Sequence, residues 1–160
     1  MSRMINNPTR GDKTAHEYPK KFYRMKRTLL WRLLRRIDMS KERIDIGGEV
    51  FGPYSSGVKA NGIIWLSGQI SLDSGESAAE QTLGCLIKID SLLEAAGASK
   101  HDICFAQVLL DDINDYTEMN EVYGNWLKDV EIAPARAAFE AANLPKGAKV
   151  EIVIQAISPE

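Results

Sequence analysis

"VKANGIIWLSGQI" (residues 58–70) decides the fold, because it has the pattern of two strands joined by a tight turn. Asn61 and Gly62 stand between two apolar runs. Asn-Gly is the pair that most readily adopts the two positive φ angles of a type I′ turn, so we predict a β-hairpin. Farther along the chain, Ser77 and Glu80 have the spacing of a capping box, which predicts the start of a helix.

The residues after this box repeat apolar positions with helical spacing as far as Gly97, where we expect the helix to end. The predicted buried stripe consists of Leu83, Leu86, Ile89, Leu93 and Ala96. A largely apolar run at 102–112 predicts a strand, buried on both faces if the run is continuous. A second helix is predicted over 115–130, since apolar residues again recur at helical spacing. Its stripe consists of Tyr116, Met119, Tyr123 and Trp126.

Two final strands are predicted at 135–143 and 148–157, joined around Pro145-Lys146-Gly147. The order of elements predicts an α+β fold, in which a sheet carries both helices on one face. Such a sheet leaves its other face bare. Because these strands are rich in Val, Ile and Ala, we expect that face to pack against another sheet, most simply in a homo-oligomer.

Charge divides the 160-residue chain into two blocks. Residues 1–38 carry eleven Lys or Arg and three Asp or Glu, whereas residues 39–160 carry nine and nineteen. We therefore expect a basic N-terminal extension, residues 1–45, followed by one domain, residues 46–160.

Residues 20–38 of the extension fit an amphipathic helix flanked by arginines. Such a segment is typical of a membrane-surface helix, a nucleic-acid patch or an organelle-targeting sequence. The alternative is that the extension is disordered or not native, because Met39 opens a stretch that resembles a natural start.

Composition excludes several classes of protein. No apolar run is long enough to span a membrane. Cys85 and Cys104 lack motif spacing, which favours reduced thiols in a cytoplasmic protein over a disulfide. His16 and His101 are isolated, so we expect no metal site. The chain also has no glycine-rich phosphate loop.

Arg136 and Glu151 are charged residues in segments that otherwise resemble buried strands. Arg136 is followed two residues later by Ala138, which leaves space beside a guanidinium suited to gripping a carboxylate or phosphate. An ion pair with Glu140 or Glu151, at an edge strand or between chains, explains Arg136 equally well. Glu151 fits either a carboxylate that activates water or a surface partner of a lysine.

Three further polar residues have structural interpretations when each is considered alone. Ser67 has no histidine partner in a recognisable motif, so a strand end is the simpler interpretation. Asn120 lies within the second predicted helix, where it either has a specific role or faces solvent. Tyr54 lies in an irregular segment and fits a cover at the edge of the core.

Taken together, several motifs resemble the Rid family, also called YjgF or reactive intermediate deaminase. The resemblance covers about residues 51–157 in the right order. Its motifs are "GPYSSGVKANGIIWLSGQI" (52–70), "EQT" (80–82), "NEVY" (120–123), "APAR" (133–136) and "LPKGAKVEI" (144–152). The resemblance implies a chorismate-mutase-like α+β fold and a homotrimeric barrel made of three sheets, with ligand sites between subunits.

The resemblance also implies cofactor-free hydrolysis of 2-imino acids, such as 2-iminopropionate arising from 2-aminoacrylate, to keto acids and ammonia. By motif, Arg136 would clamp the substrate carboxylate, while Tyr54, Ser67 and Asn120 would contribute to the substrate pocket. Glu151 would position the attacking water. Two other functions occur in the family: a non-catalytic small-ligand-binding or chaperone-like trimer, and a ribonuclease or translation inhibitor. The acidic domain makes nucleic acid an unfavourable partner, except through the basic residues 1–38.

The chain departs from the family pattern in three places. Ala138 stands where many members have a cysteine, so thiol chemistry is impossible there. The segments 70–80 and 120–136 are shorter than in archetypal members, which puts the pocket rim and the substrate in doubt. The long lead-in before the domain is not a family feature.

Overall fold

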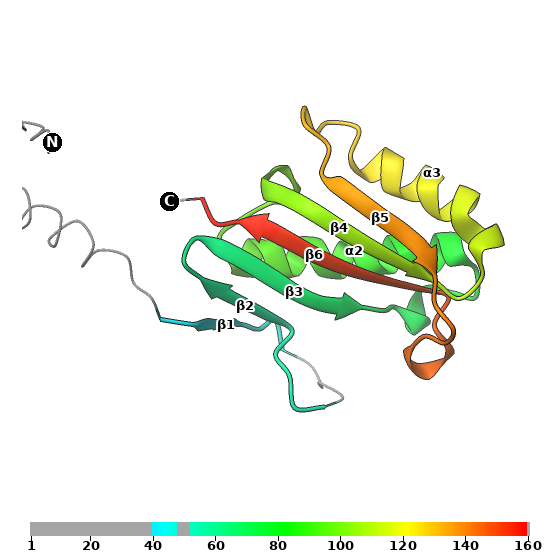
Figure 1. The fold of residues 1–160 in the computed structure, drawn as a ribbon, viewed down its shortest axis with the longest axis horizontal. Helices are drawn as coiled ribbons and strands as arrows, with labels where there is room; N and C mark the ends of the chain where they lie inside the picture. The colour runs from blue at the N-terminus through cyan, green and yellow to red at the C-terminus, as the bar shows by residue number, and fades with distance from the viewer. Residues whose placement is uncertain (1–39, 48–51, 160) are drawn as a thin grey trace, which may run out of the picture. The chain divides into compact units, whose positions relative to one another are not determined.

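The computed structural model describes residues 40–47 and 52–159, and the basic extension lies almost entirely outside them. Figure 1 shows the strands and the labelled α-helices in two layers. The strands are β1 (Glu42–Ile44), β2 (Gly57–Ala60), β3 (Ile63–Gln69), β4 (Ile103–Leu110), β5 (Ala135–Glu140) and β6 (Val150–Ile157). The helices are α2 (Ala78–Ala95) and α3 (Tyr116–Trp126), and the 3-10 turns are η1 (Leu72–Ser74), η2 (Lys100–Asp102), η3 (Ile113–Asp115) and η4 (Pro145–Gly147).

Within the described ranges the strands form one mixed sheet in the order β1-β2-β3-β6-β4-β5. The β4–β5 pair is parallel and the other pairs are antiparallel. The α+β fold class with helices on one face is confirmed. We expected the domain to start at residue 46. Strand β1 lies before that residue, and its three residues pair with β2, so the sheet begins earlier than expected.

The hairpin and the first helix begin and end as their turn and cap residues predict. Asn61 and Gly62 have φ angles of 51° and 73°, and Ala60 pairs with Ile63 across them, as a type I′ turn requires. Ser77 and Glu80 make both hydrogen bonds of the capping box. Gly97, with φ 76°, ends α2.

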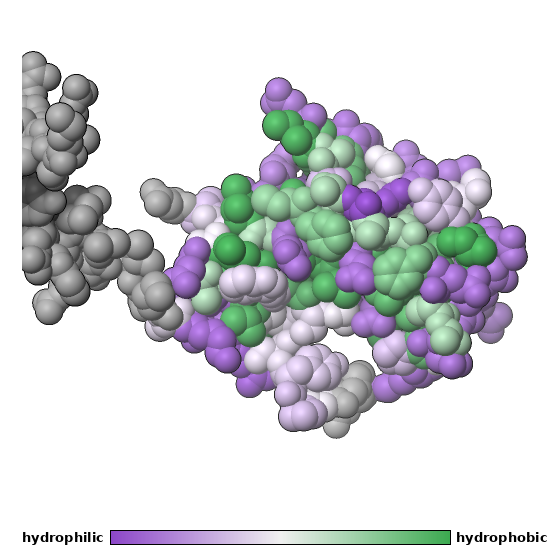
Figure 2. Space-filling model, in the orientation of Figure 1, coloured by the Kyte–Doolittle hydropathy of each residue, from purple (hydrophilic) through white to green (hydrophobic). Residues whose placement is uncertain are grey.

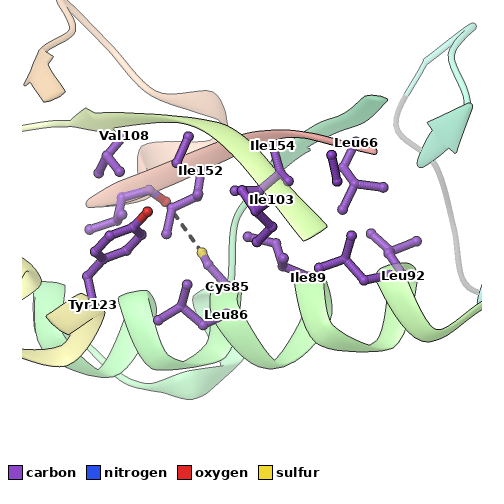
Figure 3. Close-up of a cluster of buried hydrophobic side chains, with 14 of the residues drawn as sticks. Leu66, Cys85, Leu86, Ile89, Leu92, Ile103, Val108, Tyr123, Ile152 and Ile154 are labelled. Carbon is purple, nitrogen blue, oxygen red and sulfur yellow. Dashed lines mark hydrogen bonds between the residues drawn. The ribbon is translucent and has the colours of Figure 1, made fainter. Parts of the chain in front are cut away.

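The core lies between the sheet and the two helices, on one side of the sheet only (Figure 3). Along β4 the residues alternate between buried and partly exposed, so the expectation that 102–112 is buried on both faces is wrong for the single chain. Leu83 is also misassigned, since it is 53% exposed. It shares the outer face of α2 with Ile87, one turn away, whereas Leu86 and Ile89 point into the core.

Helix α3 is shorter than predicted and ends at Trp126. Met119 and Tyr123 are buried as expected, but Tyr116 is 38% exposed. The Glu118 carboxylate accepts a hydrogen bond from the Ala78 amide at 3.1 Å, so α3 satisfies a donor at the first turn of α2.

The face of the sheet that the helices do not cover is rich in apolar side chains. Figure 2 shows this face, with green apolar surface along the strands. Ile63, Trp65, Phe139 and Ile157 are each at least 40% exposed on it. Burying such a patch removes apolar area from water, so the single chain has a surface suited to association. None of the helices among the described residues has both the length and the hydrophobicity needed to cross a membrane.

Candidate functional site

A pocket of about 380 Å³ lies where the end of β3 meets the start of β6. Its lining consists of Tyr54, Ser67, Gly68, Ile70, Pro145, Lys146 and Glu151. Glu151 reaches across β3 because Gly68 has no side chain. A Cβ on Gly68 would overlap the Glu151 carboxylate. The glycine therefore makes the room in which the carboxylate lies.

The pocket environment makes Glu151 a stronger base than an exposed glutamate. Partial burial raises the pKa of its carboxyl group, because desolvation penalises the charged form. In its ionised form, such a side chain therefore accepts a proton from water more readily than an exposed glutamate does.

The Ser67 hydroxyl fixes the opposite wall of this pocket. Its Oγ donates to the Ser55 carbonyl at 2.7 Å, and the Ser67 amide donates to the Ser56 carbonyl at 3.0 Å. These bonds tie the segment that carries Tyr54 to β3, with the Tyr54 side chain 47% exposed at the pocket. Ser67 therefore has a structural role in addition to lining the pocket.

Arg136 lies in a second group, on edge strand β5 beside α3. Its Nη2 donates to the Tyr116 hydroxyl at 2.9 Å and to Asn120 Oδ1 at 2.7 Å. Its guanidinium carbon lies 4.8 Å from the centre of the Tyr123 ring, at cation–π distance. Tyr116, Asn120 and Tyr123 all come from α3, so one helix sets the orientation of the guanidinium.

The ion pair that we considered for Arg136 is not formed within the described part of the chain. Glu140 instead accepts a hydrogen bond from the Ile113 amide at 3.0 Å. The hydrogen bonds from Arg136 to Tyr116 and Asn120 both use Nη2. Nε and Nη1 keep N–H donors outside these two bonds, on different edges of the guanidinium, and these donors remain for an anion.

The two groups lie on opposite faces of one sheet. Arg136 pairs with Ala106 of β4, which is fully buried under the helices. Glu151 pairs with Leu109, on the uncovered face. The sequence-predicted residues are therefore brought together in two sets within one chain. Asn120 lies with Arg136, and Tyr54 and Ser67 lie with Glu151.

Sequence reasoning missed three residues at these sites. Gly68 received no role of its own from the sequence, although a glycine inside a strand signals a close approach. Tyr116 was assigned to the buried stripe of its helix. Lys146 has a positive φ of 58° in the turn before β6 and lines the pocket, and nothing in its sequence spacing pointed to it.

The Cys85 thiol does not line the pocket. Cys85 is buried between α2 and the sheet, and burial raises its thiol pKa to about 12. A thiol of this pKa is inert at neutral pH. In residues 40–47 and 52–159, no group of three or more His, Cys, Asp or Glu side chains is placed to hold a metal ion.

Comparison with known proteins gives the family. The family model described as Endoribonuclease L-PSP matches residues 48–158. A 2-iminobutanoate/2-iminopropanoate deaminase from Homo sapiens is 40% identical over 112 residues, which cover 66% of this chain and 80% of that protein. A RutC family protein from Aquifex aeolicus is 37% identical over 111 residues, or 66% and 89% of the two chains.

Solved structures give the same result. The Rid family protein YyfA from Yersinia pestis has a TM-score of 0.69 at 35% identity, and E. coli TdcF with bound serine has 0.69 at 28%. Each covers 74% of this chain and 99% of the other. The chain is thus a small α+β protein whose sheet is covered by helices on one side and which carries two polar groups. The chain belongs to the Rid (YjgF, endoribonuclease L-PSP) family.

Proposed function

We propose that this protein hydrolyses 2-imino acids, including those derived from 2-aminoacrylate-type enamines, to 2-keto acids and ammonia without a cofactor. The observation that carries the proposal is the orientation of Arg136 together with its remaining hydrogen-bond donors. Its orientation is fixed by α3, it has no acidic partner in the described residues, and two of its nitrogens are left for a carboxylate. The mammalian relatives named 2-iminobutanoate/2-iminopropanoate deaminase support the same substrate class.

A homotrimer with sites between subunits is part of the proposal. A substrate that touches both Arg136 and Glu151 cannot use two residues on opposite faces of one sheet. A second copy removes this difficulty if its Glu151 pocket lies against the Arg136 group of the first. The apolar face around Trp65 and Phe139 supports such an association, because it needs a covering partner.

In the proposed mechanism Arg136 binds the substrate carboxylate through the remaining N–H donors of Nε and Nη1. Water attacks the imine carbon while Glu151 accepts a proton from that water and the imine nitrogen gains a proton. The resulting carbinolamine then loses its C–N bond after the amine is protonated, and the carbinol proton leaves as the C=O forms. One water is consumed and one ammonia is released. Orientation and a modest base suffice, because the imine is already electrophilic.

The test is ammonia release from imines generated by an amino-acid oxidase, measured for wild type and for Arg136→Lys. A lysine keeps the charge but loses the planar, fixed set of N–H donors, so we expect turnover to fall by roughly a hundredfold or more. Arg43→Lys is the matched control, because Arg43 lies on β1 and pairs with Asp45 at the surface. Wild-type rates in an intact Arg136→Lys protein would contradict the proposal.

A non-catalytic ligand-binding trimer is the second candidate, and the serine-bound TdcF structure favours it, since serine also carries a carboxylate. It predicts that keto acids or amino acids bind at Arg136 while wild type releases no ammonia beyond the buffer rate. Nuclease activity has less support, because residues 39–160 are strongly acidic and phosphate contacts need basic surface.

A further inference from the structure

Helix α2 carries a stripe of three polar side chains along one border of its buried face. Gln81, Cys85 and Lys88 are spaced by four and three residues, so they point the same way from the helix. Each forms a hydrogen bond to the backbone of a segment outside the helix. The "EQT" motif contributes Gln81, and the proposed mechanism gives it no role.

Gln81 uses both ends of its amide. Its Oε1 accepts from the Lys149 amide at 2.9 Å, and its Nε2 donates to the Gly75 carbonyl at 3.1 Å. The side chain is 5% exposed, so loss of either bond leaves a buried polar group without a partner. Lys149 lies between the η4 turn, which lines the pocket, and Glu151. Gln81 thus anchors the chain just before the proposed base.

Cys85 and Lys88 hold the other wall of the pocket. Cys85 Sγ donates to the Gln69 carbonyl at 3.1 Å, and Lys88 Nζ donates to the Ile70 carbonyl at 2.7 Å. Figure 3 shows Cys85 pointing from α2 toward the sheet. The β3–β6 register shifts between Leu66 and Gln69, which interrupts the ladder at this point. Side chains of α2 therefore supply donors where strand pairing is irregular.

We propose that Gln81, Cys85 and Lys88 are positioning residues that hold the backbone walls of the Glu151 pocket, so that the carboxylate stays aligned with the attacking water. The inference rests on the proposed function. The backbone groups that the stripe binds lie within two residues of residues that line the pocket. These lining residues are Gly68 and Ile70 on one side and Glu151 on the other. The stripe has no contact with Arg136, so it should affect the chemical step and leave carboxylate binding unchanged.

The main variant is Lys88→Met, which keeps the length of a half-buried side chain and removes its donor. Lys59→Met is the matched control. Lys59 Nζ also donates to a backbone carbonyl, that of Ala96 at 3.3 Å, but at the opposite end of α2 from the pocket. We expect Lys88→Met to lower kcat by roughly tenfold to a hundredfold with KM within about twofold of wild type. We expect Lys88→Arg, which keeps a cationic donor, to restore most of kcat.

A second measurement does not need turnover. The Glu151 carboxyl is titrated by NMR in wild type and in Gln81→Met, a replacement that changes no charge. The ionisable groups around Glu151 are Tyr54 and Lys146 in the pocket, with Cys85 and Lys88 on the α2 side of the sheet. All four are kept in this variant. We expect the pKa of Glu151 to fall toward its ordinary value, because looser walls admit water.

These measurements separate a failed inference from a failed function. If wild type has no turnover, the proposed function fails and the titration alone decides the role of the stripe. Equal losses of kcat in Lys88→Met and Lys59→Met would overturn the inference. A lowered Tm with kcat unchanged in Lys88→Met would also overturn it, because the stripe would then serve stability only. An unmoved Glu151 pKa in folded Gln81→Met is a third contradicting result.

Discussion

The Arg136 group and the Glu151 pocket are held in place by different kinds of contact. Arg136 is oriented by side chains of one helix, through two hydrogen bonds and one aromatic ring. Glu151 lies among backbone segments from β3, η4 and β6. The first group is suited to binding an anion. The second is suited to raising the basicity of a carboxylate by partial burial.

The comparison between the Arg136 group and the Glu151 pocket predicts the largest loss of activity for Glu151→Gln. The glutamine keeps the shape of the side chain but does not accept a proton, so we expect kcat to fall by roughly 10²- to 10⁴-fold. Binding of 2-oxobutanoate, measured by calorimetry, should change little because Arg136 is untouched. A variant with wild-type kcat would show that water activation does not depend on Glu151.

Gly68→Ala should come next in size. The added Cβ overlaps the Glu151 carboxylate, which must rotate away from its place across β3. We expect a loss in kcat of roughly tenfold to a hundredfold, since a displacement near 1 Å has effects of that order. Gly124→Ala on α3 is the matched control, because a Cβ there meets nothing within 4 Å. Similar kinetics for the two alanine variants would contradict the assigned role of Gly68.

The hairpin, the helix cap and the helix end were predictable from sequence because each depends on a few neighbouring residues. Asn61-Gly62 determines its own turn, and Ser77 with Glu80 closes its own cap. The arrangement of the site was not predictable in this way. Arg136 and Glu151 face opposite sides because of the registers in which β5 and β6 pair with β4, and strand order and register are long-range properties.

The misassigned residues show the same limit. Leu83 fits the apolar repeat of α2, but the sheet covers only a face that excludes it. Tyr116 fits the stripe of α3, but it stands at the first residue of the helix, where Arg136 on the edge strand lies beside it. Local periodicity predicts the helix correctly. It does not determine which other element of the fold packs against each face of that helix.

Tyr116→Phe tests the Arg136 side of the comparison and should have a modest effect. The ring is kept, and one hydrogen bond to Nη2 is lost, a contact of the kind that contributes about 1 kcal/mol. We expect KM to rise by roughly two- to tenfold with kcat nearly unchanged, in contrast to the pocket variants. Thr117→Val, which removes an exposed hydroxyl from the next residue of α3, is the control. A loss confined to kcat would mean that Tyr116 acts on the chemical step.

The smallest effect concerns stability and has the opposite sign to the effect on activity. Because the pKa of Glu151 is raised in the folded state, its ionised form is disfavoured there relative to the unfolded chain. Its contribution to stability is therefore complete below the ordinary glutamate pKa and is lost as pH rises through the raised value. We expect Glu151→Gln to have the Tm of wild type below about pH 4 and a slightly higher Tm near about pH 8.

Thermal unfolding across that pH range provides the measurement, with Glu121→Gln, an exposed position on α3, as the control for loss of a surface charge. A Glu151→Gln protein less stable than wild type at high pH would mean that a cation stabilises the carboxylate, and Lys146 is the cationic residue that lines the pocket. The predicted gain instead indicates that the protein tolerates an unfavourable charge at this site. Burial of that carboxylate raises its basicity and reduces stability for the same physical reason, so a variant that loses the proposed activity should gain stability only where Glu151 would be ionised.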